Sequence, residues 1–154
     1  MDRSAVHDTF TLDRHFGAAP SRIYRAFADP GAKSQWFAGP PDAKQEDVSF
    51  DFREGGKETS VTVMGDGTRF GYFATYTDIV PNERIVYTYE MSMNGQRISV
   101  SVATVELRAA ADGGTDLVLT EQGVYLDGLD QPQARRQGTE QLLAALGTAL
   151  AEAA

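Results

Sequence analysis

The sequence contains no cysteine, and it has only two histidines and one tryptophan among its 154 residues. The absence of cysteine excludes disulfide bonds, thiolate catalysis and metal centres built on cysteine, such as iron–sulfur clusters. The two histidines, His7 and His15, have no third metal-ligating residue at a recognisable spacing, so support for a zinc or iron site is weak. We therefore expect neither a metal nor a cofactor.

Long hydrophobic runs and an excess of positive charge are also missing. No apolar run approaches the ~20 residues that span a bilayer, and residues 1–8 lack the apolar core of a signal peptide. The formal net charge is -8, from 22 acidic and 14 basic residues. Phosphate backbones and anionic membrane surfaces are repelled by such a charge. We expect a cytoplasmic monomer or homodimer with neither a nucleic acid nor a membrane as its partner.

What the sequence does contain is the composition of a globular domain. Hydrophobic residues make up 42% of the chain and charged residues 23%, which excludes a disordered or fibrous protein. A chain of this length buries roughly two-thirds of its unfolded surface, enough for one core. We predict a single domain over residues 1–154, of which residues 1–8 are flexible.

The N-terminal part of the sequence predicts one strand followed by two short helices. Apolar and polar residues alternate over 9–16, as in a half-buried strand. Pro20 then stands where a helix begins, and Asp29 with Pro30 gives a second helix-start signal. The second helix leads to Trp36, before glycine and proline interrupt the chain.

The remainder of the sequence predicts a sheet and one long helix. Over 48–123, segments with period 2 are separated by turns too short to hold a helix, so neighbouring strands are antiparallel. We predict six to seven strands. A helix is expected from about Pro132 to Glu152, because the apolar residues there recur at helical spacing. Its apolar stripe consists of Leu142, Leu143, Leu146 and Leu150.

This order of elements buries its apolar faces when the sheet curls around the long helix. The predicted fold is an α+β helix grip, and a ligand would lie in the cavity between the sheet and the helix. Aromatic residues on a strand face often fill a core, so these side chains can also close the cavity. The expected cavity residues are Trp36, Tyr72, Tyr76, Tyr87, Tyr89, Met91, Val100, Val102, Leu142 and Leu146.

One carboxylate, Glu121, is expected on an inward strand face, because it follows Leu117 and Leu119 with period 2. Burial there would raise its pKa, and the group could polarise a carbonyl or act as a general base, which makes Glu121 the candidate catalytic residue. A purely structural role is favoured over catalysis: Glu121 is solvated at a strand end, or pairs with Arg135 or Arg136.

Three further features are interpreted as structural. His15 is expected to be exposed at the end of the first strand. Asp51 and Arg53 share a solvent face and could form an ion pair. Gly55 and Gly56 follow them and permit the positive φ of a tight turn.

Several short motifs follow one another along the chain. They are Arg14 with Phe16, Ala19-Pro20, Tyr24-Arg25-Ala26-Phe27, Asp29-Pro30, Trp36-Phe37, Asp51-Phe52-Arg53-Glu54-Gly55-Gly56, Ile79-Val80-Pro81-Asn82-Glu83-Arg84-Ile85-Val86-Tyr87 and Thr115-Asp116-Leu117. Over about residues 10–150, their order resembles the SRPBCC (START-like) superfamily, and within it the bacterial branch named after the activator of the heat-shock-protein ATPase. Many members carry Gly-Trp near the start of the last helix, whereas this chain has Gly138-Thr139. The change leaves either more room inside or a different packing.

The resemblance implies a helix-grip fold, a cavity and a wide range of functions, and a fold alone does not fix function. Our first hypothesis is a ligand-binding domain, not an enzyme, that holds a small apolar or aromatic molecule. The first alternative is an enzyme like the cyclases and aromatases of the superfamily, with a polyketide-like or aromatic substrate and Glu121 or a cavity tyrosine moving a proton. The second is a cochaperone-like interaction domain for a heat-shock ATPase.

Overall fold

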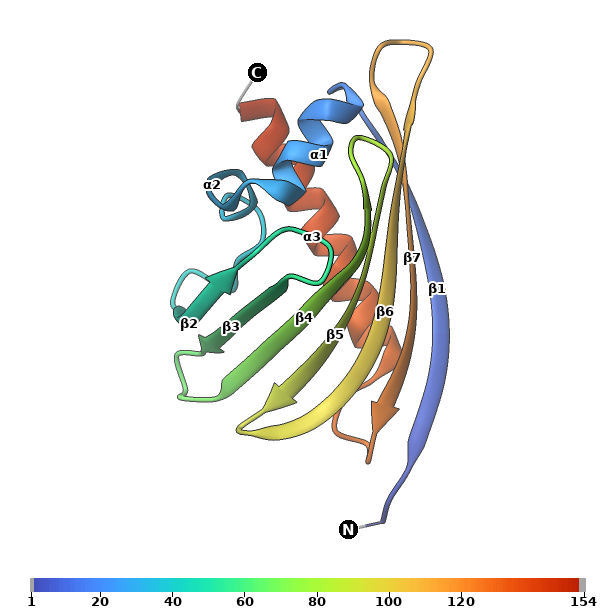
Figure 1. The fold of residues 1–154 in the computed structure, drawn as a ribbon. Helices are drawn as coiled ribbons and strands as arrows, with labels where there is room; N and C mark the ends of the chain where they lie inside the picture. Colours follow the sequence, from blue (N-terminus) through green and yellow to red (C-terminus); the bar gives the residue numbers. More distant parts are fainter. Residues whose placement is uncertain (1, 153–154) are drawn as a thin grey trace.

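The computed structural model describes residues 2–152, which form seven strands and three helices (Figure 1). In chain order these are β1 (Ala5–Phe16), α1 (Pro20–Ala28), α2 (Pro30–Lys33), β2 (Lys44–Phe50), β3 (Lys57–Val63), β4 (Arg69–Val80), β5 (Arg84–Met93), β6 (Gln96–Ala109), β7 (Thr115–Leu126) and α3 (Pro132–Glu152). The predicted α+β class is confirmed, with two short helices after the first strand and one long helix at the end.

The strands form one antiparallel sheet in the order β1-β7-β6-β5-β4-β3-β2. Strands β2 to β7 follow one another as a meander, because each connection is a short turn. Strand β1 pairs with β7 and forms the edge of the sheet opposite β2. The sheet curves, and α3 runs along its concave side (Figure 1). This arrangement confirms the helix grip predicted from the sequence.

Strand β1 starts earlier than the sequence pattern indicates. The predicted start was Thr9, after a flexible segment, but Ala5 already pairs with Leu126 and His7 with Val124. The predicted start is therefore wrong by four residues. The side chains of residues 5–9 are exposed on both sides of the strand, so no alternation of apolar residues marks this part of the ladder.

Helices α1 and α2 and the residues after them place Lys33 and Trp36 over one end of the sheet. Asp29 caps α2, and its Oδ2 accepts a hydrogen bond of 2.8 Å from the backbone N–H of Ala32. The helix is only one turn long and ends at Lys33. Trp36 follows it, and the indole Nε1 donates to the carbonyl oxygen of Ala26 at 3.0 Å. Trp36 is consequently 5% exposed.

The main core lies between α3, α1 and the part of the sheet formed by β1, β6 and β7. Leu143 and Leu146 of the predicted stripe are buried there. They pack in one cluster with Leu12 of β1, Ile23 of α1 and Leu117 of β7. Among residues 2–152, no helix is both long and apolar enough to cross a membrane.

Candidate functional site

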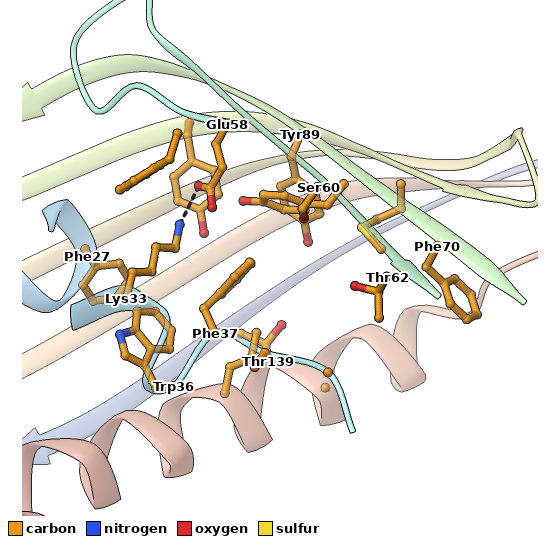
Figure 2. Close-up of a pocket in the computed structure, with 18 of the residues that line it drawn as sticks. Phe27, Lys33, Trp36, Phe37, Glu58, Ser60, Thr62, Phe70, Tyr89 and Thr139 are labelled. Atoms are coloured by element: carbon orange, nitrogen blue, oxygen red, sulfur yellow. Dashed lines mark hydrogen bonds and ion pairs between the residues drawn. The ribbon is translucent and has the colours of Figure 1, made fainter. Parts of the chain in front are cut away.

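A cavity of about 660 Å³ lies between the concave face of the sheet and α3 (Figure 2). Its volume falls within the range of pockets that bind small organic molecules. The lining includes Val48 of the edge strand β2, which is 65% exposed, so the cavity reaches the surface beside this strand. Aromatic rings dominate the wall: Phe27, Trp36, Phe37, Phe50, Phe52, Phe70, Tyr72, Tyr76, Tyr87 and Tyr89.

Most of the residues predicted to face the cavity do so. The lining contains seven of them, namely Trp36, Tyr72, Tyr76, Tyr87, Tyr89, Met91 and Leu142. Leu146 does not line the cavity, because it is fully buried in the main core beneath α3. The placement of Val100 and Val102 on the cavity face is wrong.

The error at Val100 and Val102 comes from an irregularity in strand β6. Met91 pairs with Ser99 and Ser92 with Arg97, so β6 has one extra residue at this point. Such a bulge reverses the inward and outward alternation of the side chains that follow. Ser99 is therefore buried, and Val100 is 36% exposed on the opposite face.

The space near the start of α3 is not filled by a large side chain. Gly138 and Thr139 both line the cavity. Thr139 is 8% exposed, and its hydroxyl donates to the carbonyl oxygen of Arg135 at 2.9 Å. The cavity therefore extends to the two residues that stand in place of the Gly-Trp pair.

A first polar cluster stands in the cavity wall beside α2. Lys33 Nζ lies 2.5 Å from Glu58 Oε1 of β3 (Figure 2). The same oxygen accepts a 2.6 Å hydrogen bond from the Tyr76 hydroxyl. Lys33 Nζ also lies 3.2 Å from that hydroxyl. All three side chains are buried. A cation, a carboxylate and a phenol are thus in mutual contact.

The surroundings of Lys33 act on its charge in opposite directions. Burial lowers the pKa of the Lys33 amine, whereas the Glu58 carboxylate acts to raise it, and the lowering prevails. The Nζ also lies 4.4 Å from the ring centroid of Phe37 and 5.0 Å from that of Phe50, where the ring faces attract a cation. Burial raises the pKa of the Tyr76 hydroxyl, and the negative charge of Glu58 raises it further.

A second polar cluster occupies the end of the cavity near the start of α3. Tyr89 donates a 2.8 Å hydrogen bond to Glu121 Oε2, and Arg135 Nη1 lies 3.9 Å from the same oxygen. Arg135 also donates to Ser99 at 2.9 Å and is paired with Asp130. Glu121 is thus inward-facing and buried, and the predicted pairing with Arg135 is observed.

The environment of Glu121 raises its pKa above the ordinary value of a glutamate. Burial raises its pKa, although the hydrogen bond from Tyr89 and the charge of Arg135 oppose the rise. Two further tyrosine hydroxyls in the wall are free to bind a ligand: those of Tyr72 and Tyr87 make no hydrogen bond to residues 2–152. The cavity can therefore hold an aromatic molecule and offer it several polar contacts.

The other candidates identified from the sequence lie outside the cavity. His15 is exposed, and its two ring nitrogens each lie 2.8 Å from a carboxylate, Asp116 or Asp112, which raises its pKa. Asp51 and Arg53 form the expected surface ion pair at 2.7 Å. In the described part of the chain, His, Cys, Asp and Glu residues form no group of three suited to a metal ion.

Sequence reasoning missed Lys33 and Glu58. Lys33 stands in a helix of one turn, too short for a periodic pattern to reveal which side is buried. Glu58 alternates with Ser60 and Thr62 along β3, and this polar side of the strand faces the cavity. Polar residues with period 2 usually indicate the solvent side of a strand. The sequence pattern therefore indicated that Glu58 faces solvent, whereas it faces the cavity.

Sequence comparison gives one family. The profile described as "Activator of Hsp90 ATPase homolog 1-like protein" matches residues 17–151. No match was found among curated proteins.

Solved structures of similar proteins come from several bacteria. An uncharacterized protein from Rhizobium leguminosarum is 45% identical, with 99% of each chain covered and a TM-score of 0.92. The Mll3558 protein from Rhizobium loti is 40% identical, with 95% of this chain and 99% of that chain covered and a TM-score of 0.87. Protein CV1439 from Chromobacterium violaceum is 27% identical, with 91% and 94% covered and a TM-score of 0.75. These relatives share the fold over nearly the whole chain.

Proposed function

The chain belongs to the family of Activator of Hsp90 ATPase homolog 1-like proteins, and from this premise we propose that it binds a small, largely apolar molecule in the cavity beneath α3. The observation that carries the proposal is the wall of ten aromatic side chains around a space of about 660 Å³. As part of the same proposal, the domain acts in the cytoplasm as a monomer or homodimer, without a nucleic acid or membrane partner.

The wall favours a flat, aromatic ligand. Each 100 Å² of apolar ligand surface removed from water contributes about 2.5 kcal/mol to binding, before the cost of immobilising the ligand. Ring pairs such as Tyr72 and Tyr89, with centroids 5.2 Å apart, offer faces and edges for stacking. The free hydroxyls of Tyr72 and Tyr87 would set the orientation of a polar substituent.

Calorimetry with a simple aromatic probe tests the proposal directly. We expect 2-naphthalenemethanol to bind with one site per chain and with a negative heat-capacity change, because apolar surface is buried. Native mass spectrometry of the protein purified from cells should in addition show a retained small molecule as a mass adduct. A protein that binds no aromatic probe and carries no adduct would not have this function.

A second candidate, a cyclase-like enzyme, is favoured by one observation, the buried Glu121 whose raised pKa suits proton transfer. The two candidates respond differently to Glu121→Gln. Binding alone needs no ionised group, so the affinity for an aromatic probe stays within a few-fold. Turnover of a substrate that vanishes in this variant, with binding intact, would favour the enzyme.

A further inference from the structure

The buried amine of Lys33 has no part in simple apolar binding. The chain has three lysines, and only Lys33 lies in the cavity wall, while Lys44 and Lys57 are exposed. Replacing a buried ion pair such as Lys33 and Glu58 by apolar residues is often neutral or stabilising. A lysine facing a ligand cavity therefore invites a chemical explanation beyond the stability of the fold.

The groups around Lys33 are those that the reaction of an amine with a carbonyl requires. Glu58, 2.5 Å from Nζ, can take up and return protons, and the Tyr76 hydroxyl can donate to an oxygen. The faces of Phe37 and Phe50 lie next to Nζ and stabilise a cation there. Desolvation of the amine is a recognised way to activate a lysine as a nucleophile.

The opposite end of the cavity shows why Lys33 is singled out. There Arg135, Glu121 and Tyr89 form a similar set of cation, carboxylate and phenol. A guanidinium stays protonated in proteins and does not act as a nucleophile. A lysine amine can lose its proton, so the two similar clusters differ in what they can do chemically.

We propose that Lys33 captures aromatic or other apolar aldehydes and ketones as an imine on its Nζ. This inference rests on the proposed function, because the carbonyl compound must first occupy the cavity. The aromatic wall selects the apolar body of the ligand, and Lys33 selects its carbonyl group.

The reaction needs no oxidant, reductant or further reactant. Glu58 takes a proton from the Lys33 ammonium, and the neutral amine forms a bond to the carbonyl carbon while the C–O π bond breaks. Through Glu58 the new oxygen gains a proton and the nitrogen loses one, which gives the carbinolamine. Glu58 then protonates the hydroxyl, and the C–O bond breaks as water leaves. The products are water and an iminium cation paired with the Glu58 carboxylate.

The geometry also favours the product of this reaction. An iminium carries the same charge as the ammonium that it replaces. It therefore keeps its attraction to Glu58 and to the faces of Phe37 and Phe50. The cavity beside Nζ accommodates the apolar group that the nitrogen now carries.

Reductive trapping tests the proposal on the unmodified protein. The protein is incubated with 2-naphthaldehyde and sodium cyanoborohydride, and peptide mapping by mass spectrometry locates the naphthylmethyl group. Lys44 and Lys57 serve as internal controls in the same chain. We expect Lys33 to be labelled at least tenfold faster than either, and excess 2-naphthalenemethanol to suppress its labelling. Labelling of Lys44 and Lys57 without preference for Lys33 would overturn the proposal.

Binding of 2-naphthalenemethanol separates this proposal from the proposed function, since the alcohol has the same ring but no carbonyl. If the alcohol binds and Lys33 is not labelled, imine formation is wrong and the binding domain stands. If neither compound engages the cavity, both are wrong. The Lys33→Met, Glu58→Gln double variant removes the amine without leaving an unpaired carboxylate. It should lose the fast labelling, while Lys44 and Lys57 react at their unchanged slow rates. If that variant does not fold, the competition in the unmodified protein decides.

Discussion

At the scale of single residues, burial is what gives the cavity its chemistry. Lys33 and Glu121 are both 7% exposed or less. Burial lowers the pKa of the Lys33 amine and raises the pKa of the Glu121 carboxyl. Each also keeps a carboxylate or cation partner and a tyrosine hydroxyl within contact distance. The cavity wall therefore contains an amine and two carboxyl groups that can exchange protons, and apolar rings surround them.

Neighbouring residues of β4 offer a matched test of the binding site. Tyr72 faces the cavity, whereas Phe73 is 40% exposed on the other side of the sheet. We expect Tyr72→Ala to weaken binding of 2-naphthalenemethanol about tenfold, because it removes roughly 1–1.5 kcal/mol of ring contact. Phe73→Ala should leave the affinity unchanged. Calorimetric titration measures both, and an equal loss in the two variants would place the ligand elsewhere.

The raised pKa of Glu121 predicts a pH dependence of stability. A carboxyl group whose folded pKa lies above its unfolded value contributes stability below the unfolded value of about 4.3, and this is lost as the pH rises through the folded pKa. Each unit of elevation corresponds to about 1.4 kcal/mol. Relative to the wild type, Glu121→Gln should therefore be more stable at pH 7.5 than at pH 4. Urea unfolding of both proteins measures this difference, and a constant or opposite trend would contradict it.

At the scale of elements, the sequence pattern predicts the fold well and the cavity wall less well. Helix α3 was predicted over its observed range because its leucines repeat at helical spacing. The side chains of β5 were assigned correctly because alternation continues from Ile85 to Met91. In β6, one extra residue reversed the faces at Val100. Such a bulge depends on pairing between strands, which alternation within one strand does not reveal.

Helix α3 should be required for the stability of the whole domain, and Leu146 is its most buried side chain. We expect Leu146→Ala to lower the free energy of unfolding by about 2–5 kcal/mol, because it leaves a cavity in the main core. Gln141→Ala, on the exposed side of the same helix, should change it by less than about 0.5 kcal/mol. Urea unfolding distinguishes them. A small effect of Leu146→Ala would mean that α3 packs loosely on the sheet.

At the scale of the whole molecule, one domain combines a packed core and an open space. The core lies beneath the middle and end of α3, whereas the cavity adjoins its start and the α2 end of the sheet. A ligand that fills the space would stabilise the domain by mass action, by about 2.7 kcal/mol at a hundred times its dissociation constant. Stability and binding are thus linked through the volume left beside Gly138 and Thr139.

Filling that volume should weaken binding strongly without harming the fold. Thr139 is buried and lines the cavity, and many members of the superfamily that the sequence resembles carry tryptophan after the corresponding glycine. We expect Thr139→Trp to reduce the affinity for 2-naphthalenemethanol at least tenfold, because the indole would occupy the ligand's space. The free energy of unfolding should be unchanged or higher, since apolar surface is buried in an existing void. Thr148→Trp, on the exposed side of the same helix, controls for the added ring and should keep the affinity. Calorimetry and urea unfolding of the two variants give both quantities. A Thr139→Trp protein that binds as tightly as the wild type would show that the ligand does not enter the space beneath α3.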